Sequence, residues 1–187
     1  MIENVQEEIF DIVDEKGNPT GKTVSRSIAH KEGIKHRTAH VWIIDKNTNP
    51  MRVLLQKRAI NKDSFPGKLD TSSAGHIHAG DTPCESAVRE LFEELGITAE
   101  TTDLNFIGTF AVSYEKEFHN TIFKDNEVAF VYTYEDKVDA SKLVLQKEEV
   151  DCVEWISLPE LFTARQNNDD RFCVPRGGLA LLKDYLS

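Results

Sequence analysis

The stretch from Gly75 to Ile97, GHIHAGDTPCESAVRELFEELGI, specifies a loop, a helix start, an amphipathic helix and a helix stop in one short segment. Residues 82–85, Thr-Pro-Cys-Glu, have the form of a capping box, with Thr as N-cap, Pro at the first helical position and Glu reaching back. Gly96 is placed to end the helix in the left-handed conformation. The segment therefore predicts a helix over residues 83–95 with an apolar stripe of Ala87, Val88, Leu91 and Leu95.

The same helix concentrates acidic side chains on one face. Glu90, Glu93 and Glu94 follow Arg89, and residues i, i+3 and i+4 of a helix lie together. Like charges that close repel, so the arrangement is destabilising unless a cation lies among them. Carboxylate oxygens suit a hard divalent ion such as Mg²⁺ or Mn²⁺. A solvated acidic face is the plain alternative, but the glycine-bearing loop ahead of the helix favours metal-dependent chemistry on phosphate.

Composition excludes several other classes of protein. The chain has 187 residues, 40% hydrophobic and 29% charged, which is typical of a soluble globular domain. No apolar run approaches the roughly 20 residues of a membrane span, and the first residues lack the regions of a signal peptide. Its three cysteines show no metal-binding spacing, and its net charge of −10 disfavours nucleic acid. We expect a cytoplasmic single domain over residues 1–187, with no membrane segment and no nucleic-acid partner.

Strands and helices alternate along the chain without a break in composition. β-rich apolar runs predict strands at residues 8–13, 40–44, 53–56, 106–114, 127–134 and 154–156. Helical patterns predict helices at 158–166 and 178–186 in addition to 83–95. This order by itself indicates only a mixed α and β fold.

Residues 75–97 resemble the Nudix box, G-x5-E-x7-R-E-U-x-E-E-x-G-U, where U is aliphatic. The matching positions are Gly75, Arg89, Glu90, Leu91, Glu93, Glu94, Gly96 and Ile97. Asp81 stands where the pattern has Glu, which keeps the charge and shortens the reach by one methylene. A pattern with so many fixed positions is specific. The resemblance implies a Nudix fold of the α+β class, an α/β/α sandwich in which a mixed β-sheet is flanked by helices.

The resemblance also implies roles for the residues of the box. Metal would be held by Glu90, Glu93, Glu94 and the carbonyl of Gly75, with Arg89 orienting the carboxylates. A glutamate outside the box completes such sites, and the candidate is Glu127. The general base is either Glu90 or Glu127, between which the sequence does not choose.

The activity implied by the resemblance is hydrolysis of a small-molecule diphosphate with Mg²⁺ or Mn²⁺ as cofactor. The substrate would be a nucleoside diphosphate derivative or a related X-linked diphosphate, and the identity of X is not specified by the sequence. The sequence leaves the oligomeric state open, and the family resemblance suggests a homodimer.

A narrower likeness is to the branch of Nudix proteins that includes isopentenyl-diphosphate isomerase. Residues 52–76 are similar to that branch, and Glu127 matches its second catalytic position. The metal ligands of the isomerases are matched by His30, His36 and His76, which bind metal or phosphate or are retained as structure. The isomerases have a cysteine that acts as the catalytic acid just before the Gly-His of the box, where this chain has Ala74. A methyl group cannot transfer a proton, so hydrolysis is the first interpretation; an isomerase-like enzyme and a non-catalytic diphosphate-sensing module are the alternatives.

Basic residues ahead of the box are the candidates for phosphate binding, since the charge of a leaving group needs cationic partners. These candidates are Lys57, Arg58, Lys62 and Lys68. Lys57 and Arg58 are adjacent on a predicted strand, so they face opposite ways and at most one points inward. For each of the four, a role in surface solubility is the alternative.

Overall fold

The structure, a computed structural model, describes residues 7–187. In chain order the elements are β1 (Ile9–Val13), β2 (Pro19–Ser25), α1 (Arg26–Glu32), β3 (His36–Asp45), β4 (Arg52–Arg58), β5 (Leu69–Asp70), β6 (Ser73–His76), α2 (Pro83–Leu95), η1 (Thr101–Asp103), β7 (Leu104–Phe118), β8 (Thr121–Tyr134), η2 (Ala140–Lys142), β9 (Val150–Ser157), α3 (Leu158–Gln166) and α4 (Arg176–Tyr185). No helix within this described range is both long enough and apolar enough to cross a membrane.

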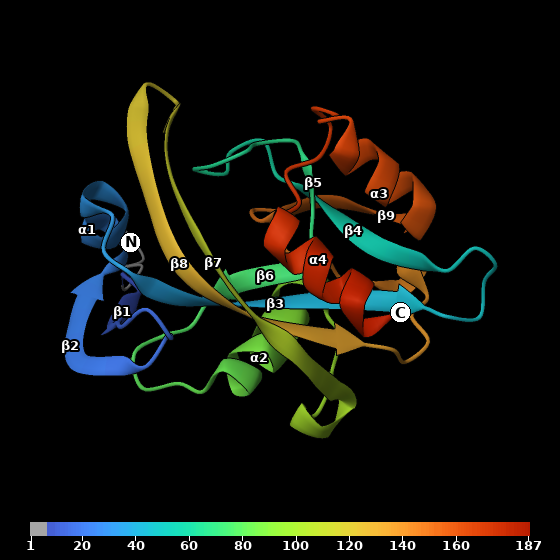
Figure 1. Cartoon of the computed structure of the whole chain (residues 1–187), viewed down its shortest axis with the longest axis horizontal. Coiled ribbons are helices and arrows are strands. Elements are labelled where there is room, and N and C mark those ends of the chain that lie inside the picture. Colours follow the sequence, from blue (N-terminus) through green and yellow to red (C-terminus); the bar gives the residue numbers. More distant parts are fainter. Residues whose placement is uncertain (1–6) are drawn as a thin grey trace, which may run out of the picture.

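Seven strands form the central sheet in the order β5-β4-β3-β8-β7, with β6 beside β3 and β9 beside β4. The sheet is mixed because β3 and β8 run parallel, whereas the pairs β3–β4 and β7–β8 are antiparallel. Figure 1 shows the β7–β8 hairpin as a long curved ribbon that reaches beyond the sheet toward α1. A separate two-stranded sheet is made by β1 and β2.

Helices cover both faces of the sheet, because alternate residues of β3 point to opposite sides. Ala39, Val41 and Ile43 pack in one core cluster with Leu91 and Leu95 of α2. A second cluster on the other face joins β3 to helices α3 and α4 through Trp42, Ile44, Leu161 and Leu182. Figure 1 shows α2 on one side of β3 and α4 on the other. The predicted α/β/α sandwich of the α+β class is confirmed.

One edge of β3 is shared by two strands. Residues 43–45 of β3 pair with β4, residues 38–41 pair with β6, and β8 occupies the opposite edge. Among the described strands β4 and β6 do not pair with each other. The two strands therefore diverge as they leave β3.

The predicted helix over residues 83–95 is confirmed with both of its ends. The hydroxyl of Thr82 accepts from the backbone N–H of Glu85 at 3.4 Å, and Gly96 has the left-handed conformation with φ 70°. The helix predicted at 158–166 is α3, and that at 178–186 is α4 with slightly different ends. Each predicted strand is present; β1 is one residue shorter than predicted, and the others are longer.

The elements that the sequence patterns missed are α1, β2, β5, β6 and the short 3₁₀ helices η1 and η2. Helix α1 has seven residues, too few for a clear apolar stripe. Strand β2, PTGKTVS, is mostly exposed and has one buried residue, Val24. Strand β6, SAGH, contains neither a β-branched residue nor a large apolar residue that would mark a strand.

Candidate active site

A cavity of about 340 Å³ lies where β4 and β6 separate. Its volume is at the lower end of the range of roughly 300–1,000 Å³ that is common for small-molecule sites. The lining comes from α1, α2, β3, β5, β6, the β7–β8 hairpin, the loops after β4 and before β9, the end of α3 and the segment 173–175. Acidic, basic and histidine side chains dominate it, so the cavity suits a charged ligand.

The carboxylate of Glu90 lies directly against the backbone of β6. A Cβ atom added at Gly75 would be 2.0 Å from Cδ of Glu90, so only glycine fits there. Arg89 donates to Glu90 Oε1 at 2.7 Å and to Glu93 Oε2 at 3.1 Å. Both of these bonds come from Nη1 of Arg89. Its Nη2 donates to the carbonyl of His76 at 2.8 Å, and this bond joins α2 to β6. Arg89 therefore fixes the positions of two carboxylates of the box.

Glu94 is held on one side by donors from three segments. Its Oε2 atom accepts from Ser73 Oγ at 2.7 Å, Gln56 Nε2 at 3.1 Å and the N–H of Ala74 at 3.1 Å. No residue in the described range donates to Oε1. The side chain is buried, and the second oxygen keeps its capacity to bind a cation.

Burial gives the two box carboxylates raised pKa values. Loss of hydration and the nearby charge of Glu94 raise the pKa of Glu90 to about 8, and burial raises the pKa of Glu94 to about 7. Few positive charges surround these two buried carboxylates, so a bound divalent cation would stabilise their ionised form. With Gly75 packed against Glu90, these carboxylates fit the oxygen ligation expected for Mg²⁺ or Mn²⁺.

These raised pKa values predict that the metal-free protein loses stability as the pH rises. Between pH 4.5 and about 8, folded protein keeps protons on Glu90 and Glu94 that the unfolded chain has released. The free energy of unfolding therefore falls across this window and levels off above it. Thermal unfolding in a chelator should show a Tm that decreases from about pH 5 to pH 8.

Two comparisons check this pH dependence. The decrease in Tm should be smaller in Glu90→Gln, which has no carboxylate to ionise at that position, and smaller in wild type with excess Mg²⁺. A Tm that changes with pH equally in wild type and Glu90→Gln would contradict the assignment.

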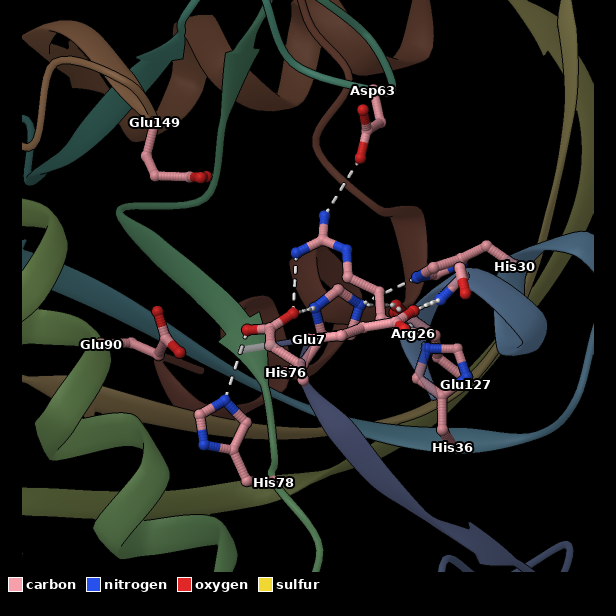
Figure 2. A network of polar contacts seen from close by, with 12 residues as sticks. Glu7, Arg26, His30, His36, Asp63, His76, His78, Glu90, Glu127 and Glu149 are labelled. Carbon is pink, nitrogen blue, oxygen red and sulfur yellow. Dashed lines mark hydrogen bonds and ion pairs between the residues drawn. The ribbon is translucent and has the colours of Figure 1, made fainter. Parts of the chain in front are cut away.

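Glu127 lies in a different group of side chains from Glu90 and Glu94. Its Oε2 atom accepts from Thr38 Oγ1 at 3.1 Å, and its Oε1 atom is 3.6 Å from Nε2 of His36 and 3.8 Å from Nε2 of His76. Figure 2 shows Glu90 on the α2 side, apart from Glu127 and the histidines. The outer glutamate predicted for the box thus belongs to a histidine cluster.

This histidine cluster is composed of His30, His36 and His76 with Asp125 and Glu127, and it has the donor spacing of a metal site. Ligand atoms of the three histidines lie within 4.8 Å of one another, as do those of His36 with the two carboxylates. Nε2 of His36 and Oδ1 of Asp125 are buried without a partner in the described range. Unpaired buried polar atoms at this spacing fit the ligand set of a bound cation.

The protonation states of the cluster also suit metal binding. Burial lowers the pKa of His30 to about 4 and lowers that of His76, so both imidazoles are neutral at pH 7. Burial alone would raise the pKa of Glu127, but its close contacts with His36 and His76 hold this pKa well below its usual range. Burial and the charge of Glu127 raise the pKa of Asp125 to about 9. Neutral imidazole is the form that binds metals.

Of the predicted phosphate-binding residues, Arg58 and Lys62 line the cavity, and Lys57 and Lys68 do not. Arg58 donates to Asp70 at 3.3 Å and to the carbonyl of Ser64 at 2.9 Å. Lys62 is paired with Glu149. The alternation along β4 places Arg58 inward, whereas Lys57 pairs with Asp151 at 3.5 Å on the outside and Lys68 pairs with Asp170.

Sequence reasoning missed Arg26 and Glu149, which also line the cavity. Arg26 is paired with Glu8 at 2.8 Å and with Asp63 at 3.2 Å, and Figure 2 shows it between the histidine cluster and the loop after β4. The charge of Glu149 contributes to the raised pKa of Glu94. Arg26 precedes His30 by one helical turn, which is a usable signal, but nothing marks Glu149 within the run QKEE.

Comparison with protein families gives a match to the family described as NUDIX domain over residues 34–176. Nudix hydrolase 3 of Arabidopsis thaliana is 40% identical over 157 residues, which are 82% of this chain and 20% of that protein. The chain thus spans about a fifth of the length of this plant relative. An uncharacterized Nudix hydrolase of Clostridium acetobutylicum is 36% identical over 166 residues, covering 89% of this chain and 78% of that protein.

Isomerases are also among the relatives. Isopentenyl-diphosphate Delta-isomerase 2 of Photorhabdus laumondii is 27% identical over 170 residues, covering 90% of this chain and 88% of that protein. The likeness to the isomerase branch that the sequence predicts is therefore confirmed at lower identity.

Solved structures of low sequence identity share the fold. A crystal structure of a Deinococcus radiodurans protein superimposes with a TM-score of 0.66 at 17% identity, covering 88% of this chain and 92% of that chain. The NUDIX domain of Shewanella oneidensis NrtR, complexed with ADP ribose, gives a TM-score of 0.56 at 15% identity over 81% of this chain and 88% of that chain.

Proposed function

Because this chain belongs to the NUDIX domain family, we propose that it is a divalent-metal-dependent hydrolase that cleaves the diphosphate linkage of a nucleoside diphosphate derivative or a related X-linked diphosphate. The observation that supports this most is the burial of Glu90 and Glu94 together in the cavity, against Gly75, with raised pKa values. Nothing in the fold requires two buried carboxylates at one place, and their destabilising effect is offset when a cation binds.

The residues of the box would hold the cation: Glu90, Glu93, Glu94 and the carbonyl of Gly75. When bound, the cation supplies neutralisation of phosphate oxygens and a lower pKa for a water nucleophile. Arg89 positions the carboxylates, and Gln56 and Ser73 orient Glu94. Lys62 and Arg58 lie in the cavity to stabilise the charge of the departing phosphate.

For the general base, the structure adds a candidate to Glu90 and Glu127. Glu149 lines the cavity, and its negative charge raises the pKa of Glu94. Glu127 lies among the histidines instead. We assign the outer glutamate of the box site to Glu149 and place Glu127 in the histidine cluster. That cluster offers nitrogen and oxygen donors together, which suits Mn²⁺ or Zn²⁺ better than Mg²⁺.

An isomerase-like activity is the second candidate, and the histidine cluster with Glu127 favours it. Ala74 pairs with His40 across β3 and β6 and supplies no thiol at the position of the isomerase acid. Cys173 does line the cavity, and burial raises the pKa of its thiol well above the usual range. Its place after α3 differs from that of the missing cysteine, so hydrolysis remains the better-supported activity.

The test is a panel of diphosphates incubated with Mg²⁺, with Mn²⁺ and with a chelator. The panel contains ADP-ribose, dephospho-coenzyme A and isopentenyl diphosphate, and the products are separated by chromatography. We expect cleavage of the diphosphate in at least one compound, and only when metal is present. Conversion of isopentenyl to dimethylallyl diphosphate would support the isomerase. Thermal stabilisation by a compound that is never cleaved would support a sensing module.

A further inference from the structure

We infer that Arg165 binds a second anionic group, separate from the diphosphate, on the X moiety of the substrate. This inference rests on the proposed function and narrows its substrate class. Arg165 lies in the last turn of α3 and lines the cavity together with the segment from Cys173 to Pro175. It comes from a part of the chain that the Nudix box does not include.

Arg165 differs from the other cations of the cavity in having no acidic partner. The others are each paired with a carboxylate: Arg26 with Glu8, Arg58 with Asp70, and Lys62 with Glu149. Within residues 7–187, no carboxylate lies within ion-pair distance of Arg165. Nη1 donates to the carbonyl of Phe172 at a long 3.4 Å, and Nε is buried without a partner.

A partly buried guanidinium with unused donors is costly unless an anion pairs with it. Its planar fork of N–H groups matches a phosphate or a carboxylate in two-point contact. Many carboxylates line the cavity, yet none of those in the described range forms an ion pair with Arg165. The pairing is therefore left for a ligand.

A purely structural role would be a favourable contact with the carbonyls at the end of α3, since cations stabilise helix C-termini. Arg176 already supplies a cation at the C-terminus of α3, because its Nη2 donates to the carbonyl of Arg165 at 3.3 Å and to Oδ1 of Asn168 at 2.6 Å. A stabilising charge at the helix end also does not require a guanidinium that lines the cavity with its Nε buried.

The diphosphate and the anion at Arg165 are different groups because they lie near different elements. The diphosphate must reach the carboxylates of α2, and Lys62 is the cation whose charge acts on Glu94. Helix α3 packs on the opposite face of the sheet from α2. The inferred substrate class is therefore a nucleoside diphosphate derivative with an additional phosphate or carboxylate on X.

Matched substrate pairs test this inference. ADP-ribose is compared with ADP-ribose 2′-phosphate, and dephospho-coenzyme A with coenzyme A, using wild type and Arg165→Gln. We expect wild type to prefer the phosphorylated member of at least one pair. In Arg165→Gln, kcat/KM for that member should fall roughly 10- to 100-fold through KM, as for loss of a hydrogen bond to a charged group, while the unphosphorylated member is unchanged.

Two further variants separate binding from structure. Arg165→Lys should recover part of the preference, because it restores the charge without the fork. Arg171→Gln is the matched control, since Arg171 is exposed, pairs with Asp169 at 2.8 Å and does not line the cavity. Equal loss on both members of a pair in Arg165→Gln, or no loss on either, would overturn the inference.

The inference and the proposed function fail in different ways. If wild type cleaves none of the four compounds, their affinities are measured by isothermal titration instead. A preference for the phosphorylated member that disappears in Arg165→Gln would then support the anion site while the hydrolase proposal fails. Equal affinity within both pairs, or no binding at all, would overturn the anion site.

Discussion

Replacing Glu94 with Gln should lower metal-dependent turnover by at least about 100-fold, since loss of outer partners of metal ligands alone costs roughly 10–100-fold. Gln has the shape of Glu and can still accept from Ser73, Gln56 and the N–H of Ala74. The fold should therefore persist, and the metal-free variant should be at least as stable as wild type at pH 8, because a buried charge is removed.

The measurements for Glu94→Gln are kcat at saturating Mg²⁺, metal affinity by isothermal titration, and Tm. Glu160→Gln is the control, because Glu160 is an exposed carboxylate of α3 outside the cavity. Activity equal to wild type in Glu94→Gln, with the same metal affinity, would refute the placement of the cation at the box.

Gly75→Ala should remove activity and also destabilise the protein, by about 1–3 kcal/mol as for overpacking in a rigid core. The added Cβ would be 2.0 Å from Cδ of Glu90, a distance at which one of the two must move. Arg89 holds Glu90 at 2.7 Å and is itself bonded to His76 next to Gly75, so the carboxylate has little freedom to move aside.

A double variant separates steric from chemical effects. Gly75→Ala combined with Glu90→Ala removes the clash, so its Tm should exceed that expected from adding the two single effects. Activity should stay absent, because the carboxylate is gone. If Gly75→Ala alone unfolds at the wild-type temperature and turns over substrate normally, the close approach of Glu90 is not required.

The elements that sequence patterns could locate are those governed by local chemistry. The ends of α2 follow from Thr82 and Gly96, which act within one turn of the helix. The first half of β3, His-Arg-Thr-Ala, does not read as a strand, although it is buried throughout. Thr38 lines the cavity, His36 belongs to the histidine cluster and Arg37 pairs with Asp11. The local pattern and the fold therefore disagree at the candidate site.

The same distinction applies to the candidate site. Arg89, Glu90 and Glu94 lie within two turns of one helix, so their proximity follows from sequence spacing alone. The position of Glu127 depends on its register opposite His36 in the β3–β8 pair, a long-range fact that spacing does not contain. Which lysines and arginines line the cavity likewise depends on how the loop after β4 folds back.

Strand β6 ties the two groups of ligands to a single register. Successive residues of a strand face opposite sides, so Gly75 meets Glu90 on the α2 side while Ala74 and His76 face the side of the histidine cluster. Sliding β6 by one residue along β3 would exchange these faces, placing a side chain against Glu90 and withdrawing the imidazole of His76 from Glu127. An insertion or deletion that shifted β6 by one residue would thus disable both groups in one event.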